Sequence, residues 1–126
     1  MKRGWIAIGL IAAAMILGGM EYLYLHSAAD KYLSMLDEAD AHMEQNEAFE
    51  AQSVTERLEH RFGGDKRVLH IFAFHSDINA LSDDLAAMRR YARTGNTADY
   101  LAQSAQLRSR IQALRDLRSP KPENVL

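Results

Sequence analysis

A metal site or an acid–base centre in this sequence would have to be built from its five histidines and seventeen acidic residues. His70 and His75 are five residues apart, about 140° around a continuous helix, whereas two ligands on one face need a separation of three or four. Glu56 and His60 have that separation, but a glutamate four residues before a histidine is also an ordinary surface pair. No His-Glu-x-x-His motif occurs. The spacing therefore predicts no metal-ligating residues.

Nucleophilic and acid–base motifs are equally weak. His75-Ser76-Asp77 contains the residue types of a hydrolytic triad, but adjacent residues on a helix point in different directions. Asp37-Glu38 and Asp83-Asp84 diverge for the same reason, so neither supplies a paired acid and base. Gly63-Gly64-Asp65-Lys66 lacks the preceding strand and the glycine spacing of a phosphate-binding loop. We expect a protein that is not an enzyme, with no catalytic or cofactor-binding residues and no cofactor. His75-Ser76-Asp77 is expected to mark a local irregularity or the polar edge of a helix.

The absence of cysteine and the distribution of charge exclude several kinds of site and partner. The 126 residues contain no cysteine, which excludes disulfides, a lipid-modified cysteine anchor and thiolate sites. Residues 27–65 carry ten acidic and three basic side chains, whereas residues 66–126 carry ten basic and six acidic ones. The arginines of the second half are spread among aspartates, with no aromatic platform between them, so we expect no nucleic-acid binding. The two halves are instead expected to fold onto each other.

An apolar segment opens the sequence. The seventeen residues 4–20 carry no formal charge, and the apolar character resumes after Glu21. As a helix, residues 4–25 would be about 33 Å long, enough to cross a hydrocarbon layer of about 30 Å. Lys2 and Arg3 would stay in the cytoplasm by the positive-inside rule. We expect a single-pass signal anchor in the plasma membrane, with a cytoplasmic N-terminus and an extracytoplasmic C-terminal domain.

The alternative to a retained anchor is a secretory signal that is cleaved from the mature protein. A secretory signal has an apolar stretch of about 7 to 15 residues followed by a small-residue cleavage site, and Ser27-Ala28-Ala29 could serve as that site. The apolar run here is longer, and the bulky stretch from Glu21 to His26 resembles a helix passing through a lipid interface. Both features favour retention.

Helical periodicity runs through the rest of the chain. The apolar stripes, with steps mostly of three and four, are Tyr32, Met35, Leu36, Ala39 and Met43; Phe49, Val54, Leu58 and Phe62; Ile71, Phe74, Ile78, Leu81, Leu85, Met88 and Ala92; and Tyr100, Ser104, Leu107, Ile111 and Leu114. The third stripe resembles a coiled-coil seam. Val68, Phe72 and Ala73 widen it, so we expect this part to be buried on more than one side.

Turn-forming residues predict where the helices end. The first helix after the membrane segment should end near Gln45-Asn46, with Asn46 capping the second. Gly63-Gly64 is the clearest break after the membrane segment, and Asp65 is placed to cap the third helix. Gly95 is suited to a left-handed C-cap, and either Asn96 or Thr97 to the following N-cap.

The expected fold is all-α: an N-terminal transmembrane helix followed by a small antiparallel bundle of about four helices. Residues 1–26 form the cytoplasmic tip and anchor, residues 27–119 the extracytoplasmic bundle, and residues 120–126 a tail that either frays or docks its apolar end on the bundle. The first helix of the bundle either packs with the others or projects as a stalk, and its aromatic and methionine stripe favours packing.

The order of these features resembles a family of short bacterial membrane proteins, domain of unknown function 4363. The residues that carry the resemblance are the basic start with its single apolar segment, Asn46-Glu47-Ala48-Phe49-Glu50-Ala51, His75-Ser76-Asp77-Ile78 leading into Leu81 and Leu85, the Leu101–Leu114 helix and Glu123-Asn124-Val125-Leu126. The resemblance implies a single-pass protein with a helical extracytoplasmic domain and supplies no activity. It also implies a protein partner in the bilayer.

We therefore expect a membrane-anchored helical module that binds another membrane or envelope protein, with the lipid bilayer itself as the second partner. Gly9 with Ala13, and Ala14 with Gly18, are small residues four apart, a spacing that permits self-association of the anchor. The alternative is an extracytoplasmic sensor, in which a cleft lined by Tyr32, Phe72, Phe74 or Tyr91 takes a small molecule or lipid.

Overall fold

The computed structural model describes residues 2–72 and 75–117, apart from the side chains of Phe72 and Leu117. Within these ranges the chain forms four helices and no strand: α1 (Lys2–Glu44), α2 (Ala48–Phe72), α3 (His75–Thr94) and α4 (Thr97–Leu117). The all-α fold expected from the periodicity is confirmed. The expected tail, residues 120–126, lies outside the described residues.

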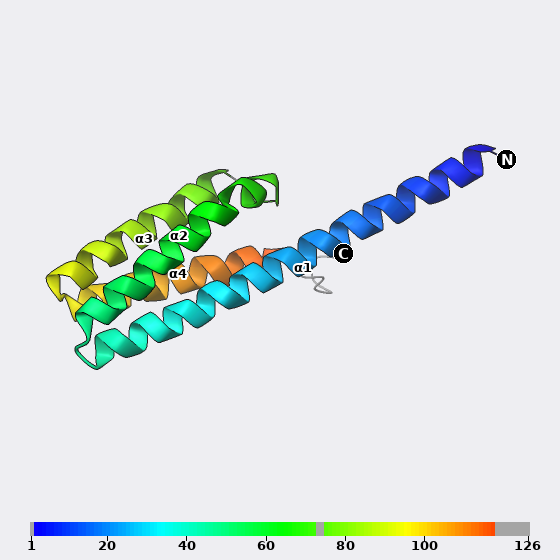
Figure 1. Cartoon of the computed structure of the whole chain (residues 1–126). Helices are drawn as coiled ribbons and strands as arrows, with labels where there is room; N and C mark the ends of the chain where they lie inside the picture. Colours follow the sequence, from blue (N-terminus) through cyan, green and yellow to red (C-terminus); the bar gives the residue numbers. More distant parts are fainter. Residues whose placement is uncertain (1, 73–74, 118–126) are drawn as a thin grey trace.

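The 43-residue helix α1 has two halves with different surroundings. Residues 2–20 are all exposed, and Leu25 is the first buried residue. The first half projects from the bundle, whereas the second half is one of the bundle's own helices (Figure 1). The expected packing of the first bundle helix is therefore confirmed, and the apolar segment continues into it without a break.

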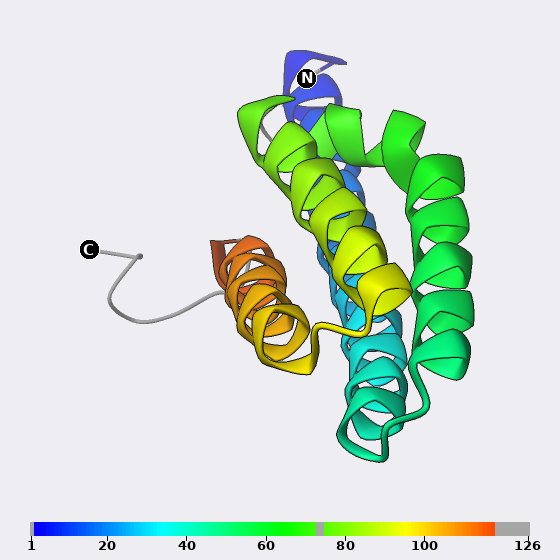
Figure 2. The same cartoon turned by 90° about the vertical axis from the view of Figure 1, so that its left-hand side faces the viewer.

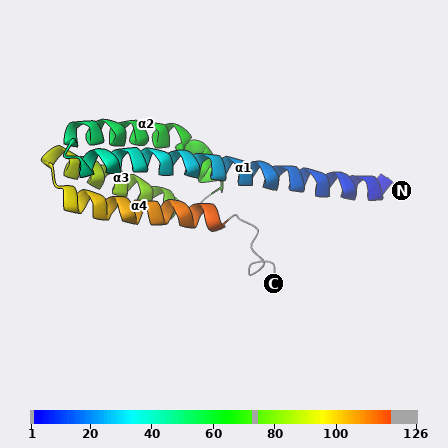
Figure 3. The same ribbon diagram turned by 90° about the horizontal axis from the view of Figure 1, so that it is seen from below.

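The bundle is antiparallel, and each helix has two neighbours (Figure 3). α1 packs against α2 and α4, and α3 packs against the same two helices. The buried apolar side chains from the expected stripes are Tyr32, Leu36, Ala39 and Met43 on α1; Val54, Leu58 and Phe62 on α2; Ile78, Leu81, Leu85, Met88 and Ala92 on α3; and Tyr100, Leu107 and Ile111 on α4. Steps of three and four residues place these side chains on one side of each helix, and together they form the core of the bundle.

Three apolar residues assigned to the stripes are exposed instead. Phe49, in the first turn of α2, is 79% exposed, and Ile71, near the end of that helix, is 73% exposed. Val68 is 36% exposed, so the expected burial of this region on more than one side is wrong for it. Phe74, Ala73 and the side chain of Phe72 lie outside the described residues.

Residues 45–47 connect α1 to α2, and the chain turns at Asn46, which has a left-handed backbone with φ 61°. The amide of Glu47 donates to the carbonyl of His42 at 2.8 Å, and that of Asn46 donates to the carbonyl of Met43 at 3.1 Å. These two bonds form a Schellman motif, which satisfies the last carbonyls of α1. The expected cap at Asn46 is therefore corrected: Asn46 ends α1, and the carbonyl of Glu47 accepts the first bond of α2 from Ala51.

The connection from α3 to α4 has the same form, with Gly95 at φ 69° as expected. The amide of Asn96 donates to the carbonyl of Tyr91 at 2.9 Å. The side chain of Asn96 accepts a bond from the amide of Asp99 at 3.3 Å, which is the N-cap interaction. Both predicted roles in this turn are confirmed, with Asn96 rather than Thr97 as the N-cap.

The predicted break at Gly63-Gly64 is wrong, because α2 continues through it to Phe72. A glycine pair weakens a helix by about 1 kcal/mol per residue but does not forbid it. Leu69 beyond the pair is fully buried, and this burial offsets the cost. α2 bends before its end, and its last turns run across the end of the bundle to α3 (Figure 2). The third helix accordingly begins at His75 and not at Asp65.

Candidate functional site

Asp65, which the sequence predicted to cap the third helix, instead forms a hydrogen bond between two helices. The hydroxyl of Tyr32 on α1 donates to Oδ2 of Asp65 on α2 at 2.6 Å. Burial raises the pKa of Tyr32 above its ordinary value, and the bond to Asp65 raises it further. The ring of Tyr32 also packs edge-on against Phe62, with centroids 6.1 Å apart. Asp65 therefore joins α2 to α1 instead of starting a helix.

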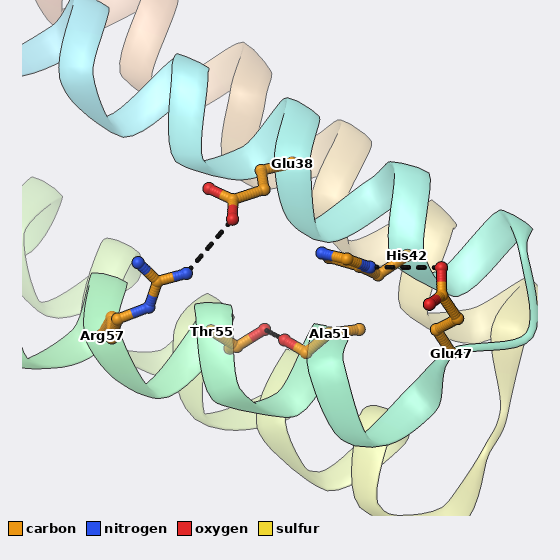
Figure 4. Close-up of polar contacts among 6 residues, drawn as sticks. All are labelled: Glu38, His42, Glu47, Ala51, Thr55 and Arg57. Carbon is orange, nitrogen blue, oxygen red and sulfur yellow. Dashed lines mark hydrogen bonds and ion pairs between the residues drawn. The ribbon is translucent and has the colours of Figure 1, made fainter.

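A second buried polar contact crosses the bundle diagonally from α2 to α4. The hydroxyl of Thr55 donates to the carbonyl of Ala51 at 2.8 Å (Figure 4), so it accepts the proton of Tyr100, 2.8 Å away. Both side chains are fully buried. Burial raises the pKa of Tyr100 to about 12. This pair is a structural link and not a titrating centre near neutral pH.

The acidic half of the chain pairs with the basic half, as its charge pattern predicts. Arg108 on α4 lies 2.6 Å from Asp37 and 3.3 Å from Asp40 on α1. Arg115 lies 3.1 Å from Asp30, seven residues before Asp37, which matches the antiparallel order of the two helices. Between α2 and α3, Glu59 accepts two bonds from Arg89, at 3.0 and 3.3 Å.

Two further polar contacts lie between α1 and α2 (Figure 4). Arg57 lies 3.2 Å from Glu38, and His42 lies 3.4 Å from Glu47. The two carboxylates of Asp37-Glu38 therefore diverge as predicted, one toward α4 and the other toward α2.

Asp84 is the most buried carboxylate among the described residues, at 5% exposure. Gln103 donates to it at 2.7 Å, and Arg110 forms an ion pair with it at 2.8 Å. Burial raises its pKa, and Arg110 partly counters that effect. Its neighbour Asp83 is exposed, so this pair diverges as well. Asp84 joins α3 to α4, a role that no spacing in the sequence indicated.

The structure brings together the two histidines that the spacing separated. His70 and His75 stack with their ring centroids 4.6 Å apart, and their Nδ1 atoms are 3.2 Å apart. The 140° argument assumed one continuous helix, whereas His70 lies in the last turn of α2 and His75 begins α3. His75-Ser76-Asp77 is thus the start of a helix. Among the described residues, no three histidine, aspartate or glutamate side chains are grouped so as to hold a metal ion.

Free volume inside the described part of the bundle is small. The central space holds about 10 Å³ and is lined by Tyr32, Leu58, Phe62, Leu81, Leu85, Leu107 and Ile111. That is about the minimum for one water, whereas ligand pockets are about 300 to 1,000 Å³. Of the side chains expected to line a cleft, Tyr32 is buried in this core and Tyr91 is half-buried. Those of Phe72 and Phe74 lie outside the described residues.

Larger depressions lie on the described surface. One holds about 210 Å³ between α3 and α4 and is lined by Asp77, Leu81, Arg110, Ala113 and Leu114. Another holds about 510 Å³ and is lined by Met35, Ser53, Glu56, Arg57, His60 and Arg61. Phe49 lies on the same stripe of α2 as Ser53, Glu56 and His60, because steps of four, three and four return to one side of a helix. We call Met35, Phe49, Ser53, Glu56 and His60 the α1–α2 outer face.

The fold defines a class of protein: a four-helix bundle whose first helix extends outward as an exposed apolar segment. The chain belongs to the family described as domain of unknown function DUF4363, whose model matches residues 20–125. The match covers the bundle and leaves most of the apolar segment outside. No curated protein and no solved structure matches the chain. The family adds no activity to the description of these surfaces.

Proposed function

We propose that this protein is a membrane-anchored module whose helical bundle, outside the cytoplasm, binds another membrane or envelope protein. The single observation that supports the proposal is the continuity of α1. A stretch within it is long and apolar enough to cross a membrane, and none of that stretch is buried. In water this exposed apolar surface would be costly, whereas in lipid it is favourable. The same helix then becomes a core element of the bundle, so the anchor and the bundle are rigidly joined.

The partner surface that we propose is the α1–α2 outer face. Phe49 is 79% exposed there, and exposed aromatic side chains are frequent anchors of protein interfaces. Next to it is the open 510 Å³ depression, with a methionine and a rim of charged residues. An apolar anchor beside a polar rim is the usual composition of a protein interface.

The sensor alternative receives less support. A central space of about 10 Å³ is far below the volume of a small-molecule ligand. The depression between α3 and α4 is larger, at about 210 Å³, but still below the volume of a typical ligand pocket.

Two experiments test the proposal in living cells. A C-terminal reporter enzyme that is active only outside the cytoplasm tests the orientation, and activity is expected. A photo-crosslinking amino acid at Ser53 tests the surface, with Gln106 on α4 as the matched exposed control. We expect a crosslinked product of defined mass at Ser53 and none at Gln106. A cytoplasmic C-terminus would overturn the localisation, and the absence of a product at Ser53, together with no reproducible partner in mild detergent, would overturn the binding role.

A further inference from the structure

The last turns of α2 lie at the end of the bundle from which α1 projects. Figure 1 shows this end of the bundle beside the middle of α1, and Figure 2 shows the last turns of α2 running across it. The bond from Tyr32 to Asp65 and the complete burial of Leu69 fix this segment against the bundle. Its position relative to the anchor is therefore set by packing.

The opposite side of the same turns faces outward. At about 100° per residue, Ile71 is about 160° around the helix from the buried Leu69, with Val68 and Arg67 on either side of it. Ile71 is 73% exposed, Val68 is 36% exposed and Arg67 is exposed. Because Leu69 points into the end of the bundle, this outward side points away from the bundle, in the direction of the projecting half of α1.

The level of this segment along α1 matches the boundary of a bilayer. Residues 4–25 as a helix are about 33 Å long, close to the hydrocarbon thickness of about 30 Å. Leu25, where burial in the bundle begins, is therefore at the outer boundary of the hydrocarbon. The end of the bundle would thus meet the headgroup layer.

We propose that residues 67–71 of α2 rest on the headgroup layer of the bilayer that holds α1, with Ile71 and Val68 at the acyl boundary and Arg67 on lipid phosphate. The proposal rests on the membrane anchoring proposed above. The combination of an apolar side with a flanking basic residue is that of an interfacial helix. Asp65, the neighbouring acid, is bonded to Tyr32 and does not oppose the phosphates.

Lipid is favoured over a protein as the occupant because of this geometry. Any partner on this side would have to fit between the end of the bundle and the membrane surface. The lipid is held there by the anchor itself, at no further cost of association. The two apolar side chains also offer less area than a stable protein interface requires.

The absence of cysteine permits a direct test with single-cysteine variants of the full chain. We would place a nitroxide label at Ile71→Cys, at Leu10→Cys in the anchor and at Ala98→Cys, an exposed position at the far end of the bundle. Each variant would be reconstituted in nanodiscs of phosphatidylcholine, with and without phosphatidylglycerol, at one copy and, for comparison, at two copies per nanodisc. Collision rates with oxygen and with a water-soluble nickel complex then report the depth of each label.

The expected result is a label in lipid at position 10, at the headgroup level at position 71 and in water at position 98. Phosphatidylglycerol should decrease the nickel accessibility at position 71, and the added substitution Arg67→Gln should reverse that decrease. Labels in lipid at position 10 but in water at both 71 and 98 would overturn this inference and leave the anchor standing. Water accessibility at position 10 would overturn both. Shielding at position 71 only in nanodiscs with two copies would indicate a protein contact and overturn the lipid assignment.

Discussion

Tyr32 and Asp65 show how one pair of residues can join two helices where the bundle meets the projecting half of α1. The carboxylate of Asp65 is half-buried and accepts the hydroxyl of Tyr32 at 2.6 Å. Hydrogen bonds to charged groups contribute about 1.5 to 3 kcal/mol when their partner is removed, and less when water can replace it. The exposure of Asp65 places this bond at the lower end of that range.

Tyr32→Phe should therefore lower the free energy of unfolding by about 1 to 2 kcal/mol, measured by urea denaturation. Tyr91→Phe is the matched control, because Tyr91 is half-buried and no hydrogen bond of its hydroxyl is found among the described residues. It should change stability by less than about 0.5 kcal/mol. Equal effects of the two substitutions would show that the Asp65 bond contributes nothing.

Three carboxylates, Asp40, Glu59 and Asp84, have a pKa raised chiefly by burial. A folded pKa above the unfolded value means that the folded state binds the proton more tightly. The contribution of these groups to the free energy of unfolding is therefore greatest below the unfolded pKa, about 4, and decreases as the pH rises through the folded pKa.

Asp84→Asn should reduce this dependence, since an amide does not titrate. The measurement is urea unfolding of both proteins at several values between about pH 4 and about pH 7. We expect the stability difference, variant minus wild type, to increase as the pH rises through the folded pKa. A difference independent of pH would mean that Asp84 has the same pKa in the folded and unfolded chains.

At the scale of the elements, glycine occurs both inside a helix and in a turn between helices, and the sequence predicted a break at both places. Gly63 and Gly64 lie inside α2 with ordinary backbone angles, and an added Cβ would meet no atom within 4 Å at either. Gly95 has the same free space but a φ of +69°, which L-residues rarely adopt. Because the free space is the same, the backbone conformation alone decides whether a substitution by alanine stabilises or destabilises the protein.

Gly64→Ala should stabilise the protein by about 0.5 to 1 kcal/mol, because alanine restricts the unfolded chain and favours the helix. Gly95→Ala should destabilise it by about 1 to 2 kcal/mol, because a left-handed residue acquires a Cβ. Thermal unfolding of both variants checks the pair of signs. A loss of stability in Gly64→Ala would indicate that the glycine pair interrupts α2 after all.

The helices themselves were largely predictable from the sequence. Steps of three and four residues identified most of the core side chains of all four, since the period of an α-helix is a local property. The junction between α2 and α3 was not predictable. Gly63-Gly64 carries the strongest local signal for a break, but the burial of Leu69 in the bundle outweighs the propensity of two glycines.

At the scale of the whole molecule, α1 belongs to two environments. Residues 2–20 are all exposed, and the core begins at Leu25. The bundle thus gains no packing from the first half of α1, and a chain that begins at Glu21 retains every buried residue described.

Such a truncated chain should fold in water without detergent. We expect a helical circular dichroism spectrum and one cooperative urea transition. The full chain, by contrast, should require detergent or lipid because of its exposed apolar half. A truncated chain without a cooperative transition would contradict the independence of the bundle.

The sequence alone determined the all-α class, most of the four core stripes, the caps at Gly95 and Asn96 and the attraction between the acidic and basic halves. Each of these follows from local periodicity, local backbone preference or summed charge. Only the tertiary structure decided where α2 ends, that Asp65 binds Tyr32, that Asp84 is buried, and that His70 meets His75. These depend on which residues from distant segments meet in the bundle, and the physical reason is that packing energy summed over many contacts overrides the small local preferences on which sequence patterns are based.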